Sequence, residues 1–292
     1  MGSRDIVVQR VEAALIEAAT TFRDDQLRAY QRAIEAETNE AARWALEAML
    51  ENARVAAARG YPLCDDTGIP HLIVEVGAEV TLTGELLAAV KEGVAAGQRA
   101  LPTRPMGLKG SDEERLSQSG GISDDPAAVV PPAMMLKMVP GDELRITVLL
   151  QGGGPEIRSR TFRVFHERSA EKVIREAASW AAEAAPKLGC TPMTPCIGIG
   201  RTHYEATTLM LEAMQQGTFD RQNEWERLVT ELVNGTKTGS LGLGGSVTAL
   251  GCFLRVGPQR ASGLRHVCMR PACAVDPRRG IAVFKRDELI EG

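Results

Sequence analysis

Four short segments of the sequence combine reactive side chains with glycine or proline turns. They are Pro62-Leu63-Cys64-Asp65-Asp66-Thr67-Gly68, Gly152-Gly153-Gly154-Pro155-Glu156, Gly189-Cys190-Thr191-Pro192, and Arg265-His266-Val267-Cys268 with Cys273 after it. Two adjacent aspartates repel each other unless cations or hydrogen bonds compensate. The alternative interpretation of the same residues is a solvated turn, in which Asp66 or Thr67 accepts hydrogen bonds from nearby backbone amides. Asp-Thr-Gly also occurs in aspartic proteases, but those need two such carboxylates and this chain has one copy.

The cysteines have the most specific chemistry in these segments. Cys268 and Cys273 are five residues apart, outside the gap of roughly two to four residues that is typical of zinc pairs. Three thiolates that leave one coordination position open suit a catalytic iron–sulfur cluster. Cys64, Cys190 and one of Cys268 or Cys273 lie beside glycine- or proline-rich turns, where such a cluster could be reached.

Two further features have both a functional and a structural explanation. Backbone amides at Gly152–Gly154 can approach an anion closely because no Cβ intervenes, and a flexible turn explains the same three letters. His266 is either a site residue or a hydrogen-bonded structural histidine. Cys196 lies in an apolar run, so we expect it to be a small core residue.

Composition and charge exclude several classes of protein. The chain has 292 residues, of which 44% are hydrophobic and 25% charged, as in ordinary globular proteins. The formal net charge of −4 and the lack of a dense Lys/Arg run argue against nucleic-acid binding. No stretch reaches the ~18 consecutive apolar residues of a membrane helix, and the first residues lack the apolar core of a signal peptide. We therefore expect a cytoplasmic protein that binds neither nucleic acid nor membrane.

The elements that must position these segments change along the chain. Residues 5–59 are predicted to be helical, because apolar residues repeat at three- and four-residue steps before Gly60 and Pro62 end the pattern. The predicted fold class is α+β (mixed α/β), with a helical N-terminal region followed by a mixed sheet and flanking helices. We expect residues 1–60 and 61–292 to be these two regions of one integrated, two-lobed domain.

The patterns in the second region predict individual elements. Predicted strands are 71–76, 144–151, 162–165, 196–200 and 247–255, and predicted helices are 86–100, 169–185, 204–214 and 223–233. Thr83 is the predicted N-cap of residues 86–100, and Pro186 with Gly189 ends the helix 169–185. We expect residues 162–165 to pair antiparallel with 144–151.

Together, these segments resemble the iron–sulfur hydro-lyases, the family of class I fumarases and L-tartrate dehydratases, in its α subunit or N-terminal half. The family's Cys-Gln-Asp-Thr-Gly is similar to Cys64-Asp65-Asp66-Thr67-Gly68, and its Ala-Cys-Pro-Pro to Gly189-Cys190-Thr191-Pro192. Its glycine triplet resembles Gly152–Gly154, its glycine-rich segment Asn234–Gly245, and its closing segment Arg265-His266, Cys273 and Arg278-Arg279-Gly280. The resemblance follows the same order over nearly the whole chain.

This resemblance implies a site built on a [4Fe–4S] cluster. The implied ligands are Cys64, Cys190 and Cys273, with Cys268 as the alternative third ligand because the stretch after His266 is shorter than in the family. The implied catalytic residues are Asp66 at the substrate hydroxyl, Arg104 on a substrate carboxylate, and His266, which hydrogen-bonds substrate near the cluster. The implied substrate-binding residues are Asp65, Thr67, Gly153 and Gly154.

Asp65 stands where the family has Gln, which removes an amide donor and adds a negative charge beside an anionic substrate. We expect either a substrate other than fumarate or compensation by a nearby arginine.

The implied activity is the reversible dehydration of a small 2-hydroxy dicarboxylic acid such as malate or tartrate. In this family the base that removes the C–H proton lies in the β subunit or C-terminal half, for which no room remains after Arg279. We therefore expect an α subunit that pairs with a β chain as αβ or α2β2. The alternative from another class is a non-catalytic or regulatory metabolite-binding protein that retains the fold.

Overall fold

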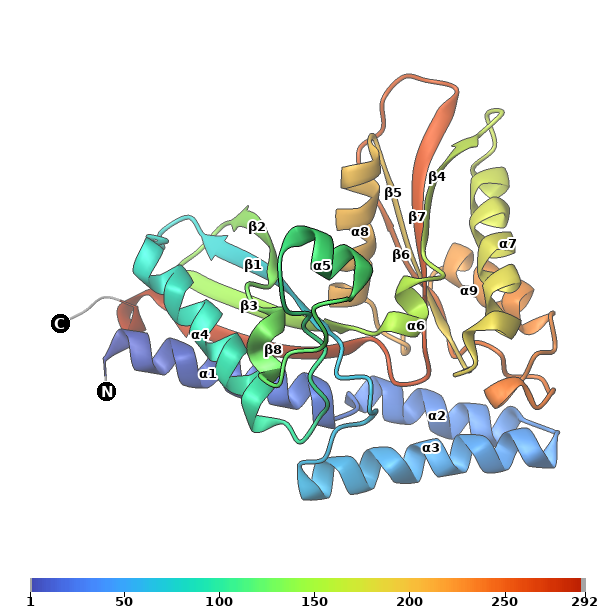
Figure 1. The fold of residues 1–292 in the computed structure, drawn as a ribbon. Helices are drawn as coiled ribbons and strands as arrows, with labels where there is room; N and C mark the ends of the chain where they lie inside the picture. The colour runs from blue at the N-terminus through green and yellow to red at the C-terminus, as the bar shows by residue number, and fades with distance from the viewer. Residues whose placement is uncertain (1, 290–292) are drawn as a thin grey trace. The chain divides into compact units, whose positions relative to one another are not determined.

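The computed structural model describes residues 2–289, and the predicted α+β class is confirmed (Figure 1). The chain forms two compact units. Unit 1 comprises Met1–Thr21, Val55–Gln151 and Arg278–Gly292, and unit 2 comprises Phe22–Arg54 and Gly152–Pro277. The units do not coincide with the expected division at residue 60, because each unit takes residues from both sides of it. No helix within residues 2–289 combines the length and apolar character needed to cross a membrane.

The predicted helical stretch at the N-terminus consists of three helices. They are α1 (Ser3–Thr20), α2 (Asp24–Ala36) and α3 (Glu40–Arg59). The chain is extended at the breaks between them, at Thr21 and at Glu37. Gly60 follows α3 with a φ of +65°, the left-handed region that glycine enters without steric cost.

Unit 1 contains a four-stranded sheet with the order β2-β1-β3-β8. Its strands are β1 (Ile69–Gly77), β2 (Ala133–Val139), β3 (Glu143–Gln151) and β8 (Arg278–Lys285). β1 is parallel to β2 and antiparallel to β3, which is antiparallel to β8. Alternate residues of β1 and β3, such as Leu72 and Ile146, are fully buried in one core with residues of α1 and α4 (Gly84–Ala100).

The predicted N-cap of α4 is confirmed, because the Thr83 hydroxyl accepts a hydrogen bond from Leu86 N at 3.1 Å. The long loop after α4 contains a short helix, α5 (Asp112–Ser117), and the 3₁₀ turn η1 (Pro126–Val129). A further 3₁₀ turn, η3 (Arg286–Glu288), follows β8.

Unit 2 contains a second four-stranded sheet with the order β4-β7-β5-β6. Its strands are β4 (Arg160–Phe165), β5 (Thr194–Gly200), β6 (Phe253–Val256) and β7 (Leu264–Ala272). β7 is antiparallel to both β4 and β5, and β5 is parallel to β6. The expected pairing of residues 162–165 with 144–151 is wrong, since β3 already has β1 and β8 on its two sides.

Helices cover both faces of the unit 2 sheet. α7 (Ala170–Leu188) and α9 (Glu224–Asn234) share one core with β5 and β7. α8 (His203–Gln216) packs on the other face, against Gly198 of β5. α7 runs through Pro186 to Leu188, and Gly189, with a φ of +80°, ends it. α6 (Gly153–Glu156) and the 3₁₀ turn η2 (Ser240–Gly242) complete the unit.

Candidate functional site

The six cysteines divide into three that are buried and three that reach the surface. The buried ones are Cys196, Cys252 and Cys268, and burial raises the pKa of each of these thiols. The accessible ones are Cys64 and Cys273, both half-buried, and the exposed Cys190. None of the six, all of which lie within residues 2–289, is in a disulfide bond. The accessible cysteines are the three that the resemblance implies as cluster ligands.

Cys64 lies in a turn between α3 and β1 that a buried arginine of unit 1 holds. The Arg278 guanidinium, from β8, is 3% exposed and donates to the backbone oxygens of Asp66, at 2.6 Å, and Thr67, at 3.2 Å. Glycine is favoured at position 68, because φ is +80° and a Cβ would lie 2.7 Å from Nη2 of Arg278. Burial raises the pKa of the Cys64 thiol, and the positive charge of Arg278 opposes that rise.

The same turn brings Thr67 and Arg104 together with Asp65. The buried Thr67 hydroxyl donates to the Arg104 carbonyl oxygen at 3.0 Å and so holds the backbone of that arginine. Nη1 of Arg104 lies 3.9 Å from Oδ2 of Asp65, and both side chains are exposed. Oδ1 of Asp66 accepts from Gly68 N at 3.1 Å, the local turn hydrogen bond that the sequence also allowed. Arg104 is thus a cation close enough to compensate the charge of Asp65.

In unit 2, Cys190 and Cys273 are brought together by the main chain. Cys190 follows the end of α7 and Cys273 follows β7, and Ala274 N donates to the Cys190 carbonyl oxygen at 2.9 Å. The fully buried Tyr30 of α2 donates its hydroxyl to Ala274 O at 2.8 Å. Burial raises the pKa of the Tyr30 phenol, and the Cys273 and Cys190 side chains raise it further.

The glycine triplet precedes and opens the one-turn helix α6. The carbonyl oxygen of Gly152 accepts from Nη2 of Arg270 at 3.0 Å. Arg270 is fully buried and also pairs with the Glu156 carboxylate, so it fixes both ends of this segment. Of the two glycines that the resemblance implies as substrate-binding, Gly153 is exposed and Gly154 half-buried.

β7 places His266 and Cys268 away from the Cys190–Cys273 pair. An extended strand advances about 3.3 Å per residue, so Cys268 lies roughly 16 Å and His266 roughly 23 Å from Cys273 along the chain. The His266 ring packs edge-on against His203, with 4.3 Å between centroids. Burial, and then the charge of His203, lowers the pKa of His266. The structure therefore does not bring His266 or Cys268 together with the two thiols.

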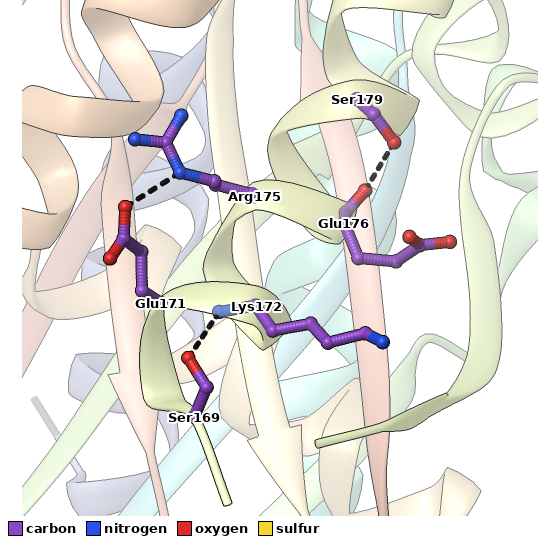
Figure 2. Close-up of a pocket in the computed structure, with 6 residues that line it drawn as sticks. All are labelled: Ser169, Glu171, Lys172, Arg175, Glu176 and Ser179. Atoms are coloured by element: carbon purple, nitrogen blue, oxygen red, sulfur yellow. Dashed lines mark hydrogen bonds and ion pairs between the residues drawn. The ribbon is translucent and has the colours of Figure 1, made fainter. Parts of the chain in front are cut away.

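A surface hollow lies along the outer side of α7 (Figure 2). Two of its charged side chains pair with each other, as Nε of Arg175 donates to the Glu171 carboxylate at 2.7 Å, and Lys172 pairs with Glu167 outside it. Ser169 caps the helix by accepting from Lys172 N at 3.1 Å. None of the residues implied as site residues lines this hollow, which is built from Ser169, Glu171, Lys172, Arg175, Glu176 and Ser179.

The implied ligands are divided between the two units. Cys64 belongs to unit 1, whereas Cys190 and Cys273 belong to unit 2. Taken one unit at a time, residues 2–289 contain no group of three His, Cys, Asp or Glu side chains arranged as metal ligands. Each unit thus supplies only part of the implied set.

Comparison with known proteins identifies the family. The family model described as Fumarate hydratase (Fumerase) matches residues 8–282, which is nearly the whole chain. The chain belongs to the fumarate hydratase family. A hydratase adds water across a double bond and a hydro-lyase removes it, so this is a family of hydro-lyases.

Relatives in the family differ in length. A Methanocaldococcus jannaschii protein named "Putative L(+)-tartrate dehydratase subunit alpha" is 27% identical, over 97% of this chain and 98% of its own length. "Putative fumarate hydratase class I" of Geobacillus stearothermophilus is 24% identical over 82% of this chain, which covers 47% of that protein. "Fumarate hydratase 2" of Leishmania major is 24% identical over 75% of this chain, which covers 40% of it. In extent, this chain matches the relative named a subunit alpha and covers less than half of each of the other two.

Sequence reasoning missed the residues that support the site in this fumarate hydratase family member. Arg278 was noted only as part of a closing motif, and Tyr30, Thr191 and Arg270 were given no role. The contact between Arg278 and Asp66 joins residues 212 positions apart, and that between Tyr30 and Ala274 joins residues 244 apart. The sequence offered one signal for them, an arginine among apolar residues of a strand. Arginine is almost never buried without partners, so such a position indicates an arginine that bonds to other residues.

Proposed function

We propose that this chain is the α subunit of an iron–sulfur hydro-lyase that reversibly dehydrates a small 2-hydroxy dicarboxylic acid such as malate or tartrate. Membership of the fumarate hydratase family supports the reaction class. The names of the relatives support the substrate class, because one is named for tartrate and two for fumarate. The observation that carries the proposal is that only three of six cysteines are accessible, each on a turn.

The donor set fits a [4Fe–4S] cluster. Cluster ligands are thiolates that must be reachable, and Cys64, Cys190 and Cys273 meet this condition whereas the buried three do not. The hydrogen bond from Ala274 N to Cys190 O sets the two turns of unit 2 side by side. We propose Cys273 over Cys268 as the third ligand, because Cys268 is buried within β7, whereas Cys273 precedes the residue whose N–H bonds to Cys190 O.

When bound, such a cluster supplies an iron without a protein ligand, which acts as a Lewis acid on the substrate hydroxyl and carboxylate. The chain itself binds and orients the substrate. Arg104 presents an exposed guanidinium that can hold a carboxylate through two parallel hydrogen bonds. Thr67 fixes the backbone of Arg104 instead of contacting substrate, since its hydroxyl is buried and already donates to that residue.

Asp65 and Asp66 have different roles in this proposal. Gly68 N holds the Asp66 carboxylate in a fixed orientation next to Cys64, where it faces the hydroxyl region of the substrate. Asp65 lies opposite Arg104 and competes with a substrate carboxylate for that guanidinium. This competition favours a substrate with additional hydroxyl donors for Asp65, as tartrate has, over fumarate. Gly153 and Gly154 stay proposed substrate contacts, through their backbone amides.

Proton removal from carbon requires a base that we place in a β chain, with αβ or α2β2 stoichiometry. One relative of matching length is named an α subunit, and this chain covers about half or less of the two longer relatives. His266 lies at the far end of β7 from Cys273, so we assign it no contact with substrate beside the two thiols.

Iron and sulfide analysis tests the proposal. We expect anaerobically reconstituted protein to contain close to four iron atoms per chain, the number in a [4Fe–4S] cluster. It should also show a broad absorption band. Cys64→Ser, Cys190→Ser and Cys273→Ser should each lose most of this iron, because each removes a ligand.

Cys268→Ala is the matched control, since it removes the alternative ligand while leaving the other thiols in place. Its iron content should equal that of the unaltered chain. Full iron in Cys273→Ser together with iron loss in Cys268→Ala would reassign the third ligand. A reconstituted chain without iron that still binds tartrate or malate would instead favour the non-catalytic metabolite-binding alternative.

A further inference from the structure

Unit 2 contains a buried carboxylate that no catalytic role explains. Glu37 follows the last residue of α2 and is fully buried. Its carboxylate accepts hydrogen bonds from the backbone N–H groups of Thr38 and Asn39, each at 2.9 Å. It also accepts from Ser246 N, at 2.9 and 3.0 Å, and from Val247 N at 2.9 Å.

These main-chain donors keep the carboxylate charged. Burial alone would raise the pKa of Glu37, but the hydrogen bonds from Asn39, Ser246 and Val247 outweigh burial and lower it. The Nε of Arg43 donates to the backbone oxygen of Glu37, at 3.0 Å, so it secures the main chain of this residue. An ionised carboxylate buried among amides fixes the backbone around it, because each N–H group must point at the carboxylate. We call the Glu37 carboxylate and these N–H groups the clamp.

The partner of this clamp is the glycine-rich turn of residues 239–247. Gly245 has a φ of +122°, and a Cβ there would lie 2.7 Å from both carboxylate oxygens of Glu37. The turn closes on itself through a hydrogen bond from Gly244 N to Thr238 O at 2.8 Å. Asn39 adds a second contact from the same side, as its Nδ2 donates to Leu243 O at 3.2 Å.

The other side of the same turn contacts the segment that carries Cys190. The Thr191 hydroxyl donates to Gly239 O at 2.6 Å and accepts from Gly242 N at 3.3 Å. Leu241 N donates to Thr191 O at 3.0 Å. Thr191 is buried, whereas the adjacent Cys190 is exposed. Three hydrogen bonds therefore fix the residue next to the thiol to a turn that Glu37 holds.

We propose that Glu37 is a positioning residue that sets the Cys190 thiol, by holding the glycine-rich turn to which Thr191 is bonded. This inference rests on the proposed function, in which Cys190 is a cluster ligand. Glu37 does not touch the thiol. Its charge fixes the backbone of residues 245–247. The turn then fixes Thr191 through its hydrogen bonds, and thereby the adjacent Cys190.

The test compares Glu37→Gln with Glu35→Gln, the same chemical change at an exposed position two residues earlier, in the last turn of α2. Amide hydrogen exchange is measured on the full chain without iron. In Glu37→Gln, we expect the amides of residues 239–247 and of Thr191 to exchange at least about tenfold faster, since hydrogen bonds to a charged acceptor are the stronger ones. Amides of β5 and β7 should be unchanged, and Glu35→Gln should match the unaltered chain throughout.

A second readout uses the reconstituted protein. Glu37→Gln should lose iron to a chelator several times faster than Glu35→Gln, and Glu37→Asp, which keeps the charge, should recover part of the difference. Equal exchange in the turn for Glu37→Gln and Glu35→Gln overturns the inference. If the unaltered chain takes up no iron, the proposed function fails, whereas the exchange comparison still decides whether Glu37 holds the Cys190 turn.

Gly245→Ala covers the case in which Glu37→Gln does not fold. This variant keeps the carboxylate but places a Cβ against its oxygens. It should accelerate exchange of the same amides, and unchanged exchange there would likewise overturn the inference.

Discussion

Arg278 holds the turn that carries Cys64 through hydrogen bonds to two backbone oxygens, those of Asp66 and Thr67. In Arg278→Gln the shorter side chain cannot reach both, and each unsatisfied buried acceptor costs about 1–3 kcal/mol. We expect the free energy of unfolding to fall by about 2–4 kcal/mol, measured by urea denaturation.

Arg286→Gln provides the comparison, because this arginine is exposed and its ion pair with Glu79 is long, at 3.8 Å. Loss of such a surface pair should change the free energy of unfolding by less than about 1 kcal/mol. Equal effects of the two substitutions would show that Arg278 does not support the Cys64 turn.

Individual site residues were predictable to different degrees. Cys64, Cys190 and Cys273 could be proposed as cluster ligands because their motifs occur in family order, and their accessibility distinguishes them from Cys196, Cys252 and Cys268. For Thr67, an expected substrate contact, the sequence does not show that its hydroxyl donates to the backbone oxygen of residue 104. Arg278 and Tyr30 bond to the backbone beside these cysteines across long separations in sequence, and local patterns carry no signal for such contacts.

At the scale of elements, the packing of α8 on β5 depends on the missing side chain of Gly198. A Cβ there would lie 2.1 Å from the backbone oxygen of Ala206 and 2.2 Å from Met210 N. Because both are backbone atoms of a helix, α8 as a whole must move. We expect Gly198→Ala to lower the free energy of unfolding by about 3 kcal/mol in a denaturation experiment.

Gly84→Ala is the matched control for this substitution. Gly84 is the first residue of α4, and no atom lies within 4 Å of a Cβ built there. The free energy of unfolding should stay unchanged or rise by up to about 1 kcal/mol, because alanine favours a helix more than glycine does. A loss as large as that of Gly198→Ala would mean that close approach of α8 is not the cause.

Elements with clear periodicity were predicted, and strands with buried charges were not. The N-terminal helices, α4, α7, β3 and β5 follow apolar patterns. β7 contains Arg270 and β8 contains Arg278, and each is buried by partners distant in sequence. Residues 247–252 were expected to be a strand, but β6 begins only at Phe253, because the preceding residues bond to Glu37 and Asn234.

At the scale of the whole molecule, the proposed division of labour between two chains predicts an iron-loaded but inactive α subunit. Loss of a general base typically costs about 10²–10⁴-fold in rate. We expect the purified chain to dehydrate L-malate and tartrate at least about 100-fold more slowly than the same chain co-purified with a β partner. The assay is product absorbance under anaerobic conditions.

Cys190→Ser in the same co-purified complex is the control, because it should abolish activity without preventing assembly. Full activity of the single chain, with iron bound, would contradict the proposed role of the β chain.

The packing of α1 against β8 has a consequence for synthesis on the ribosome. α1 and β8 meet so closely that a Cβ on Gly280 would lie 1.8 Å from the backbone oxygen of Ala14. Translation proceeds at about 5–20 residues per second, so residues 278–285 emerge roughly 10–50 s after α1 does. During that interval α4 and β3 are already available to pack against α1, but the part of the helix that β8 covers lacks its native partner. The core of unit 1 can therefore be completed only after β8 has been translated.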